Sequence, residues 1–379
     1  MFDKIIDLIR SIYGKGDVPL HAPVLSNADR EGVLEAIDCG FVSSVGPHVT
    51  QFENELALFT GATKAIAVVN GTAALHLAMI VSGVKSGEMV LTQALTFVAT
   101  ANAINYIGAT PVFLDSDLDT MGLSPEALKK FLLTHAEKRS GQAFHRETGK
   151  RLAACVPMHV FGHPVRLNEI INICSEWGIP VIEDAAESLG SKIDGRHTGT
   201  LAPIGVLSFN GNKIITTGGG GALLFKDEAL SLKARHLSTT AKRAHKWEFH
   251  HDEVGFNYRM PNLNAALGCA QMKRLPDFLE IKKNIAEKYQ DFFSAYPEVH
   301  FVGGREGTEP NWWLNAVLVR DRSERDLWLE NLNAAGIMCR PVWELMSDLP
   351  MYANCPHDGL EVARSLANRL INLPSGVPS

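Results

Sequence analysis

Short apolar runs alternate with segments of helical periodicity through the first two-thirds of the chain. The apolar runs "AIAVV", "EMVLT" and "TPVFLD" begin at residues 65, 88 and 110. An Ala/Leu-rich segment, then "FVATANAINYIG", and then "SPEALKKFL" follow them in turn, each with the spacing of a helix. Strands that alternate with helices favour crossover connections and a mainly parallel sheet with helices on both faces. The pattern therefore predicts an α/β fold.

The pattern changes after "GGGGALLFKD". A polar segment rich in His and Lys covers residues 233–252, and long helical stretches cover 262–296. A strand-like "NWWLNAVLV" and a helical "ERDLWLENLNAAG" follow, as is typical of a smaller α+β domain. We predict a large α/β domain over residues 1–245 and a small C-terminal domain over 246–379. The N-terminal "MFDKIIDLIRSIYG" has amphipathic spacing and is interpreted as a helix that docks on the protein.

Composition excludes several classes of function. The 379 residues are 46% hydrophobic and 21% charged, and the formal net charge is -6. No basic patch is visible, so a nucleic-acid partner is not expected. The apolar stretch 65–83 resembles a membrane span, but Asn70, Gly71 and His76 interrupt it, and we interpret it as a strand, a turn and a buried helix. Six scattered cysteines without a C-x-x-C pair suggest reduced thiols and a cytoplasmic location.

The turns that follow the strands carry the candidate chemistry. Gly71, Thr72 and Ala73 open a helix directly after a strand. Small residues there let backbone N–H groups approach an anion, which the helix dipole also favours, so a phosphate could bind. The alternative is an ordinary helix capped by the threonine.

Two further segments add charged groups. Asp184 follows Glu183 at the end of an apolar strand, where an acid needs a cation, a helix cap or a ligand nitrogen. Lys213 stands between an apolar stretch and four glycines, with Ser208 five residues earlier. A partly desolvated lysine is a competent amine that can bond to an aldehyde, whereas the alternative is a surface lysine on a loop.

Together these parts meet the requirements of pyridoxal 5′-phosphate, which needs an anion cradle, an acid for its pyridine nitrogen and a lysine for its aldehyde. The chain resembles the DegT/DnrJ/EryC1/StrS sugar aminotransferases, which are fold-type I enzymes. The resemblance extends from "VPLHAPVLSNADREGVLEAIDCGFVSSVGPHVTQFE" to "INLPSGV". It includes "NGTAALH", "TFVATANAI", "GATPVFLD", "VIEDAAES", "SFNGNK" and "GFNYRM".

The resemblance implies roles for individual residues. Lys213 would form the Schiff base with the cofactor, and Asp184 would keep its pyridine nitrogen protonated. Phe97 would stack on the ring, and Glu187 occupies the place of a polar residue, often His or Gln in relatives, that faces the cofactor. The residues that would bind the phosphate are Gly71, Thr72, Ala73 and Ser208, with Asn257 reaching the phosphate of the neighbouring subunit. This last role implies a homodimer with shared active sites.

Relatives usually take the amino group from L-glutamate and give it to a nucleotide-linked keto sugar. "FVSSVGPHVTQFE", "ITTGGGG" and "RPVWELMSDLPMY" most resemble the branch of the legionaminate and bacillosamine pathways. That branch aminates C4 of UDP-2-acetamido-2,6-dideoxy-4-keto-hexose, giving UDP-4-amino-4,6-dideoxy-N-acetylglucosamine for surface glycans. Arg259 is a candidate for the donor carboxylate. Candidates for the sugar nucleotide are Arg340, Trp343, Trp312 and Trp313, although the tryptophans could instead be core.

Three alternatives remain open from the sequence. The sugar could be linked to GDP or dTDP, because the motifs serve the cofactor rather than the sugar. Dehydratases related to this family carry histidine in place of the lysine, so Lys213 favours transamination. A cofactor-binding regulatory protein without turnover would need no complete donor site.

Two histidine features are interpreted as structural. His159 and His163 have the spacing of zinc ligands, but Phe161, Gly162 and Pro164 break any helix there, and no third ligand is apparent. No metal site is therefore expected. His76, on the apolar helix, is expected to be a hydrogen-bonded core residue.

Overall fold

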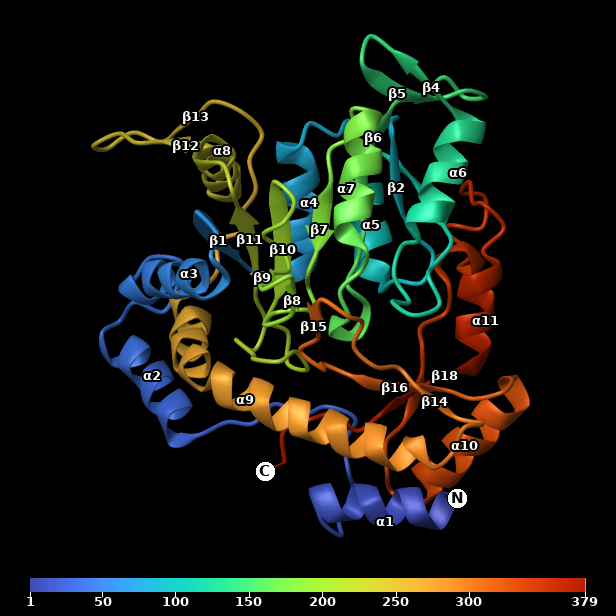
Figure 1. The fold of residues 1–379 in the computed structure, drawn as a ribbon. Helices are drawn as coiled ribbons and strands as arrows, with labels where there is room; N and C mark the ends of the chain where they lie inside the picture. Colours follow the sequence, from blue (N-terminus) through green and yellow to red (C-terminus); the bar gives the residue numbers. More distant parts are fainter. Residues whose placement is uncertain (379) are drawn as a thin grey trace.

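One large sheet runs through the centre of the protein, whose residues 1–378 are described by a computed structural model (Figure 1). Its strands lie in the order β3 (Thr110–Leu114), β2 (Met89–Gln93), β6 (Leu152–Val156), β7 (Ile182–Asp184), β10 (Ile204–Ser208), β11 (Gly221–Phe225) and β1 (Lys64–Val68). The first five strands are parallel to their neighbours, with β6 and β7 joined by isolated bridges such as Cys155 to Val181. β11 runs antiparallel to both β10 and β1. The predicted mainly parallel α/β sheet is confirmed.

Alternating side chains bury both faces of this sheet. Ile66 and Val68 of β1 point to one face of the sheet, whereas Ala65 and Ala67 point to the core on the opposite face. The first face carries α4 (Gly71–Val81), α5 (Val98–Tyr106) and α8 (Glu228–Ser238). The second carries α6 (Pro125–His135), α7 (Leu167–Glu176) and α3 (Pro47–Thr60). The strands consequently consist almost wholly of apolar residues.

The helices begin where side chains cap them. Asn70, rather than Thr72, caps α4: its Oδ1 accepts a hydrogen bond from the backbone N–H of Ala73 at 2.8 Å. The alternative of a threonine-capped helix is therefore wrong. Ser124 caps α6, with Pro125 at the first helical position, and Asp227 caps α8. These caps place the start of each helix at the carboxyl edge of the sheet or just beyond a strand.

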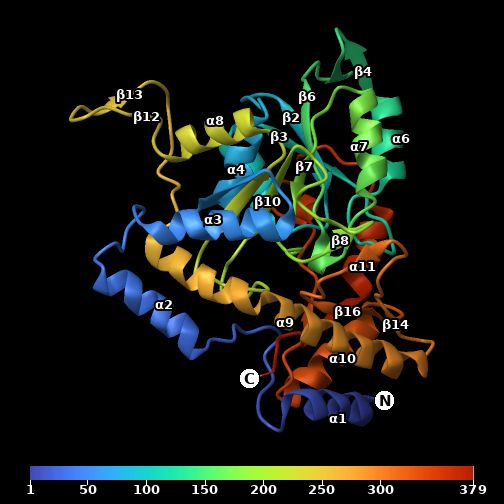
Figure 2. The same ribbon diagram turned by 60° about the vertical axis from the view of Figure 1, so that its left-hand side comes forward.

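A smaller antiparallel sheet forms the C-terminal part. It consists of β14 (His300–Phe301), β16 (Asn315–Leu318), β18 (Leu370–Leu373) and β17 (Arg340–Pro341), covered by α10 (Arg322–Ala334) and α11 (Glu361–Arg369). The predicted N-terminal helix is α1 (Phe2–Tyr13). It lies beside α10 in both views (Figure 2), and its Ile5 and Ile9 are fully buried in one cluster with Trp328.

The long helix α9 (Asn262–Ser294) belongs to both parts of the protein. Its first half packs against α3 and against α2 (Asn27–Asp38), and its second half contacts β14. Cys269 and Leu275 share a core with α3, whereas Tyr289 and Phe293 share one with Trp328. The division at residue 245 stays a prediction, and α9 is the element that spans the two parts (Figure 1).

Short hairpins project from this body (Figure 1). The predicted polar excursion 134–150 contains the hairpin of β4 (Ala136–Arg139) and β5 (Gln142–His145). The His/Lys-rich segment contains the end of α8 and a second hairpin, β12 (Lys242–Arg243) with β13 (His250–His251). A three-stranded sheet joins β15 (Thr308–Glu309), β8 (Lys192–Ile193) and β9 (Arg196–His197). Among residues 1–378, no helix combines the length and apolar character needed to cross a membrane.

Lys282 of α9 is fully buried where the two parts meet. Its Nζ donates to the backbone oxygen of Trp313 at 3.3 Å and to that of Ser375. Burial lowers the pKa of Lys282 to about 7. The amine is therefore neutral in the folded protein over a range in which an unfolded lysine, with a pKa near 10.4, carries a charge.

This difference predicts a pH dependence of stability. Because the unfolded chain binds the extra proton between about pH 7 and 10, burial of Lys282 costs most at pH 7 and below, and the cost diminishes as the pH rises. The unfolding free energy of the natural protein, relative to Lys282→Met, should rise by about 1.4 kcal/mol per pH unit across that window. Denaturant unfolding of both proteins at several pH values measures it. A difference that does not vary with pH would contradict the assignment.

Candidate active site

A cavity of about 350 Å³ lies at the carboxyl edge of the large sheet, bordered by residues of the C-terminal part. Eight of the predicted site residues line it: Gly71, Thr72, Phe97, Asp184, Glu187, Ser208, Lys213 and Trp343. The remaining wall consists of Asn70, Leu75, Ala99, Thr100, Met158, Ala186, Asn210, Asn212 and Trp313. The structure thus brings residues more than 270 positions apart into one site.

The N-terminus of α4 forms one end of the cavity. Gly71 is packed so closely that an added Cβ would lie 3.0 Å from the Cβ of Ser208, at the end of β10. Behind it, a Cβ on Gly221 would lie 2.5 Å from the carbonyl carbon of Asn70, so only glycine lets β11 pass there. The N–H of Ala73 already donates to the side chain of Asn70. The N–H groups of Gly71 and Thr72 are therefore the ones at this helix end that could donate to an anion.

Asp184 ends β7 and is 2% exposed. Its Oδ2 accepts from the hydroxyl of Thr100 at 2.7 Å, and its Oδ1 accepts from the N–H of Ala186 at 3.2 Å. Burial raises the pKa of Asp184, which these two hydrogen bonds and the charge of Lys213 oppose. A carboxylate held in this way is suited to pair with a protonated ring nitrogen.

Lys213 lies between a carboxylate and an indole ring. Its Nζ is 3.1 Å from Oε1 of Glu187 and 4.0 Å from the ring centroid of Trp313. Glu187 is 2% exposed, and its other oxygen, Oε2, accepts from the N–H of Phe161 at 3.0 Å. Burial raises the pKa of Glu187 to about 7 against the lowering effect of Lys213. Lys213 is therefore an amine in a partly desolvated site, as the sequence suggested, and not a surface lysine.

Aromatic side chains form the wall opposite α4. Phe97, at the N-cap of α5, is 46% exposed and meets Trp343 edge to face at 6.0 Å between centroids. The rings of Trp343 and Phe161 are also in contact, with their centroids 5.1 Å apart. A half-exposed aromatic at the cavity leaves its ring face available for stacking on a planar ligand.

Five predicted site residues lie outside this wall. Ala73 uses its N–H in the cap of α4. Asn257 is exposed and bridges to Thr239, Arg259 bridges to Val68, and Arg340 is exposed on β17. Trp312 is stacked on Phe301 away from the cavity. None of these residues is part of the cavity wall that this chain forms.

The two histidines with zinc-like spacing have separate environments. Nε2 of His159 is 3.3 Å from Oε2 of Glu183, and its Nδ1 accepts from the N–H of Val165. His163 meets Trp312 edge to face at 5.3 Å, and burial lowers its pKa to about 4. His76 hydrogen-bonds to Tyr258 at 3.0 Å, as expected of a core histidine.

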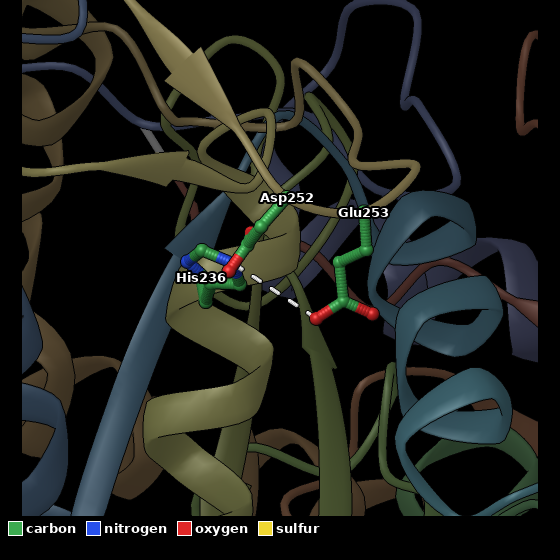
Figure 3. A group of neighbouring side chains, drawn as sticks. All are labelled: His236, Asp252 and Glu253. Atoms are coloured by element: carbon green, nitrogen blue, oxygen red, sulfur yellow. Dashed lines mark hydrogen bonds and ion pairs between the residues drawn. The ribbon is translucent and has the colours of Figure 1, made fainter.

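A group of metal-ligating residue types lies on the surface at the end of α8 (Figure 3). Nε2 of His236 is 2.6 Å from Oδ1 of Asp252 and 3.8 Å from Oε1 of Glu253. The other carboxylate oxygen of Asp252 accepts from Arg243 at 2.7 Å, and this bond, followed by that of His236, lowers the pKa of Asp252 to about 2. The arrangement is accounted for by ion pairs that hold the β12–β13 hairpin to α8.

Comparison with known proteins decides the family. The model of the DegT/DnrJ/EryC1/StrS aminotransferase family matches residues 23–378. This chain belongs to that family. It is 37% identical to EpsN of Bacillus subtilis (strain 168), assigned as a pyridoxal phosphate-dependent aminotransferase, over 94% of this chain and 90% of that protein. It is 34% identical to the GDP-perosamine synthase of Escherichia coli O157:H7, over 94% and 93%.

The fold agrees with this membership. The crystal structure of the aminotransferase TlmJ from Streptoalloteichus hindustanus superposes with a TM-score of 0.86 at 29% identity, covering 95% of this chain and 94% of TlmJ. The protein is accordingly a sugar aminotransferase of fold type I that depends on pyridoxal 5′-phosphate.

The cavity fits that cofactor by the chemistry of its donors. Two backbone N–H groups and the Ser208 hydroxyl gather at one end for a phosphate, in a cradle that a side chain at position 71 would crowd. A buried carboxylate, Asp184, lies on the same wall as the amine of Lys213, and the face of Phe97 is half exposed. These are the groups that an anionic, planar aldehyde with a basic ring nitrogen requires.

Sequence reasoning missed or misplaced several wall residues. Thr100, which bonds Asp184, lies one helical turn after Thr96 in "TFVAT", and that spacing of hydroxyls was the available signal. Trp313 was considered for the sugar nucleotide, but it lies against Lys213 and donates through Nε1 to the backbone oxygen of Asn212 at 2.6 Å. No local sequence pattern indicates that Trp313, 100 positions after Lys213, packs against the lysine amine.

The cradle predicts the effect of a single methyl group. Gly71→Ala should weaken binding of pyridoxal 5′-phosphate, because the new Cβ crowds Ser208 where the phosphate is held. Overpacking of this kind costs about 1–3 kcal/mol, and each 1.4 kcal/mol is about tenfold in affinity. Titration of the cofactor-free protein measures the change. Gly16→Ala is the control, since nothing lies within 4 Å of a Cβ there. Unchanged affinity in Gly71→Ala would contradict the assignment of the phosphate site to this end of the cavity.

Proposed function

We propose that this protein transfers the amino group of L-glutamate to the keto carbon of a nucleotide-linked sugar, with Lys213 as the catalytic amine. The observation that carries the proposal is the convergence of Lys213, Asp184 and the N-terminus of α4 on one cavity. When bound there, pyridoxal 5′-phosphate supplies an electron-withdrawing ring that stabilises negative charge at the carbon losing a proton.

The residues of this chain would divide the work. Gly71, Thr72 and Ser208 would hold the phosphate, while Asp184 keeps a proton on the ring nitrogen and thereby strengthens its electron withdrawal. Nζ of Lys213 would take the proton from the amino donor and hold it within the same site. Phe97 would stack on the ring, and the aromatic wall with Trp343 would exclude water from one side.

The acceptor sugar can be narrowed to a few classes. A UDP-linked 2-acetamido-2,6-dideoxy-4-keto-hexose is supported by the resemblance of "FVSSVGPHVTQFE" and "RPVWELMSDLPMY", the second of which supplies Trp343 to the cavity. A GDP-linked keto sugar is supported by the name of the Escherichia coli relative. Surface glycan synthesis would be the use of either product.

We also propose that two copies of the chain share their active sites. Asn257 is exposed and lies outside the cavity of its own chain, as expected of a residue that serves the partner's phosphate. Trp247 and Phe249, at 74% and 77% exposed, lie on the β12–β13 hairpin that precedes it. Large exposed aromatics on a projecting hairpin favour contact with another surface.

Replacement of Lys213 and Asp184 tests the catalytic assignment. Lys213→Ala should lose the visible absorbance that depends on a covalent bond to the cofactor, and with it the conversion of glutamate to 2-oxoglutarate. Asp184→Asn should still bind cofactor but lose activity by about 10²–10³-fold, because the ring nitrogen loses its anionic partner. Absorbance spectra and a glutamate assay measure both. A Lys213→Ala protein that still turns over glutamate would refute the proposal.

A panel of sugars tests the acceptor. The natural protein is first converted by L-glutamate, which should bleach the visible band, and is then offered UDP-, GDP- and dTDP-linked 4-keto sugars separately. The true acceptor should restore the band in a single turnover and yield an amino sugar that mass spectrometry detects. Restoration by no sugar but by a simple keto acid would contradict a sugar acceptor, and absence of bleaching would favour a regulatory role.

A further inference from the structure

Glu187 forms an ion pair with the amine of Lys213. Oε1 of Glu187 and Nζ of Lys213 are 3.1 Å apart, with the glutamate side chain 1% and the lysine side chain 13% exposed. An ion pair so poorly hydrated is costly unless each group has further partners. Glu187 has one more partner, the N–H of Phe161, and Lys213 has the face of Trp313.

The surrounding backbone is built to hold these partners. Phe161 is fully buried and has a φ of 56°, a conformation that is strained for a residue other than glycine. In this conformation the N–H of Phe161 donates to Oε2 of Glu187. On the other side, Asn311 donates to the backbone oxygens of Glu187 and Leu189, each at 2.9 Å, and its Oδ1 accepts from the N–H of Trp313. One asparagine thus joins the residue carrying the carboxylate to the residue carrying the indole.

Few other charges act on the pair. Asp184 acts on both Lys213 and Glu187, and the N-terminal segment contributes His21. Burial, and then the positive charges of Lys282 and Lys213, lowers the pKa of His21 well below its usual value, so the imidazole is neutral. Burial of Lys282 lowers its pKa to about 7 as well. Among the described residues, Glu187 is the carboxylate within hydrogen-bonding distance of Nζ.

We propose that Glu187 is the proton partner of Lys213, accepting the ammonium proton directly so that the amine becomes free without release of a proton to water. An N–H bond of the ammonium breaks and an O–H bond forms on Oε1, so that the charged pair becomes a neutral amine and a neutral carboxylic acid. The pair carries no net charge before or after the transfer. This inference rests on the proposed role of Lys213 as the catalytic amine.

The low polarity of the site favours the neutral form of such a pair. Burial raises the pKa of Glu187 to about 7, against the lowering effects of Lys213 and of the Phe161 N–H, so the surroundings of Glu187 oppose the charged carboxylate. In water the charged pair would dominate, whereas here the two forms come closer in free energy. Nζ of Lys213 lies 4.0 Å from the ring centroid of Trp313, so the indole restricts where the amine can lie.

Internal transfer has a distinctive pH signature. The fraction of the pair in the neutral form is independent of pH as long as the pair holds one proton in total. A lysine that must lose its proton to water instead becomes tenfold more reactive for each pH unit. The two cases can therefore be separated in the full-length protein without cofactor or sugar.

The experiment measures the rate at which acetic anhydride labels Lys213 between pH 6 and 9. Peptide mass spectrometry follows Lys213, and an added reference peptide corrects for the reagent. The natural protein should show a plateau between about pH 7 and 9, where the pair holds one proton in total, and Glu187→Gln should show a tenfold rise per unit over the same range. Glu187→Asp, which keeps the carboxyl group, should recover part of the plateau. Glu53→Gln, at another buried acid on α3, is the matched control and should retain the natural profile.

Two outcomes would overturn the inference. A tenfold rise per unit in the natural protein would make Glu187 only a counter-charge, and a plateau that survives in Glu187→Gln would assign the proton to another group. Circular dichroism and cofactor titration of each variant separate these results from misfolding. Failure of the proposed function would appear elsewhere, as activity retained in Lys213→Ala, because the labelling needs no catalysis.

Discussion

The active site depends on the burial of three carboxylates within five residues at the end of β7. Glu183, Asp184 and Glu187 are each exposed by 2% or less. A buried acid is tolerated only where hydrogen bonds or cations replace water. Each carboxylate therefore constrains the segment that compensates it, and those segments together make the cavity.

The three acids are compensated in different ways, and the difference separates structure from chemistry. Glu183 accepts from the backbone N–H groups of Gly199 and Ala202 and contacts His159. Both of its carboxylate oxygens are therefore hydrogen-bonded, and they hold the loop that contains Gly199 and Ala202. Asp184 is bonded to Thr100 and Ala186, yet it still lines the cavity. Glu187 alone faces a lysine amine. The segment thus progresses from an acid that holds a loop to one that lines the cavity, and then to one that contacts the amine of Lys213.

The sequence was sufficient for the parts of the site that are local. A strand end followed by small residues, an acid at the end of an apolar run, and a lysine before glycines each indicate their chemistry within a few positions. The parallel sheet then brings those strand ends to one edge, which explains why Gly71, Asp184 and Ser208 meet as predicted. Local patterns also gave α1 and the helices that cover the sheet.

The parts that escaped prediction are tertiary. Asn70 rather than Thr72 caps α4 because the cap depends on the backbone angle at which β1 ends, and the sequence offers either residue. α9 extends across both parts of the protein because apolar residues on successive turns meet two different cores. Trp313 and Asn311 reach the site from a strand-like segment whose pattern indicated only burial. Their contacts with Lys213 and Glu187 arise from packing of the C-terminal part on the sheet edge, and the surroundings of this amine and carboxylate are thereby built by residues of both parts.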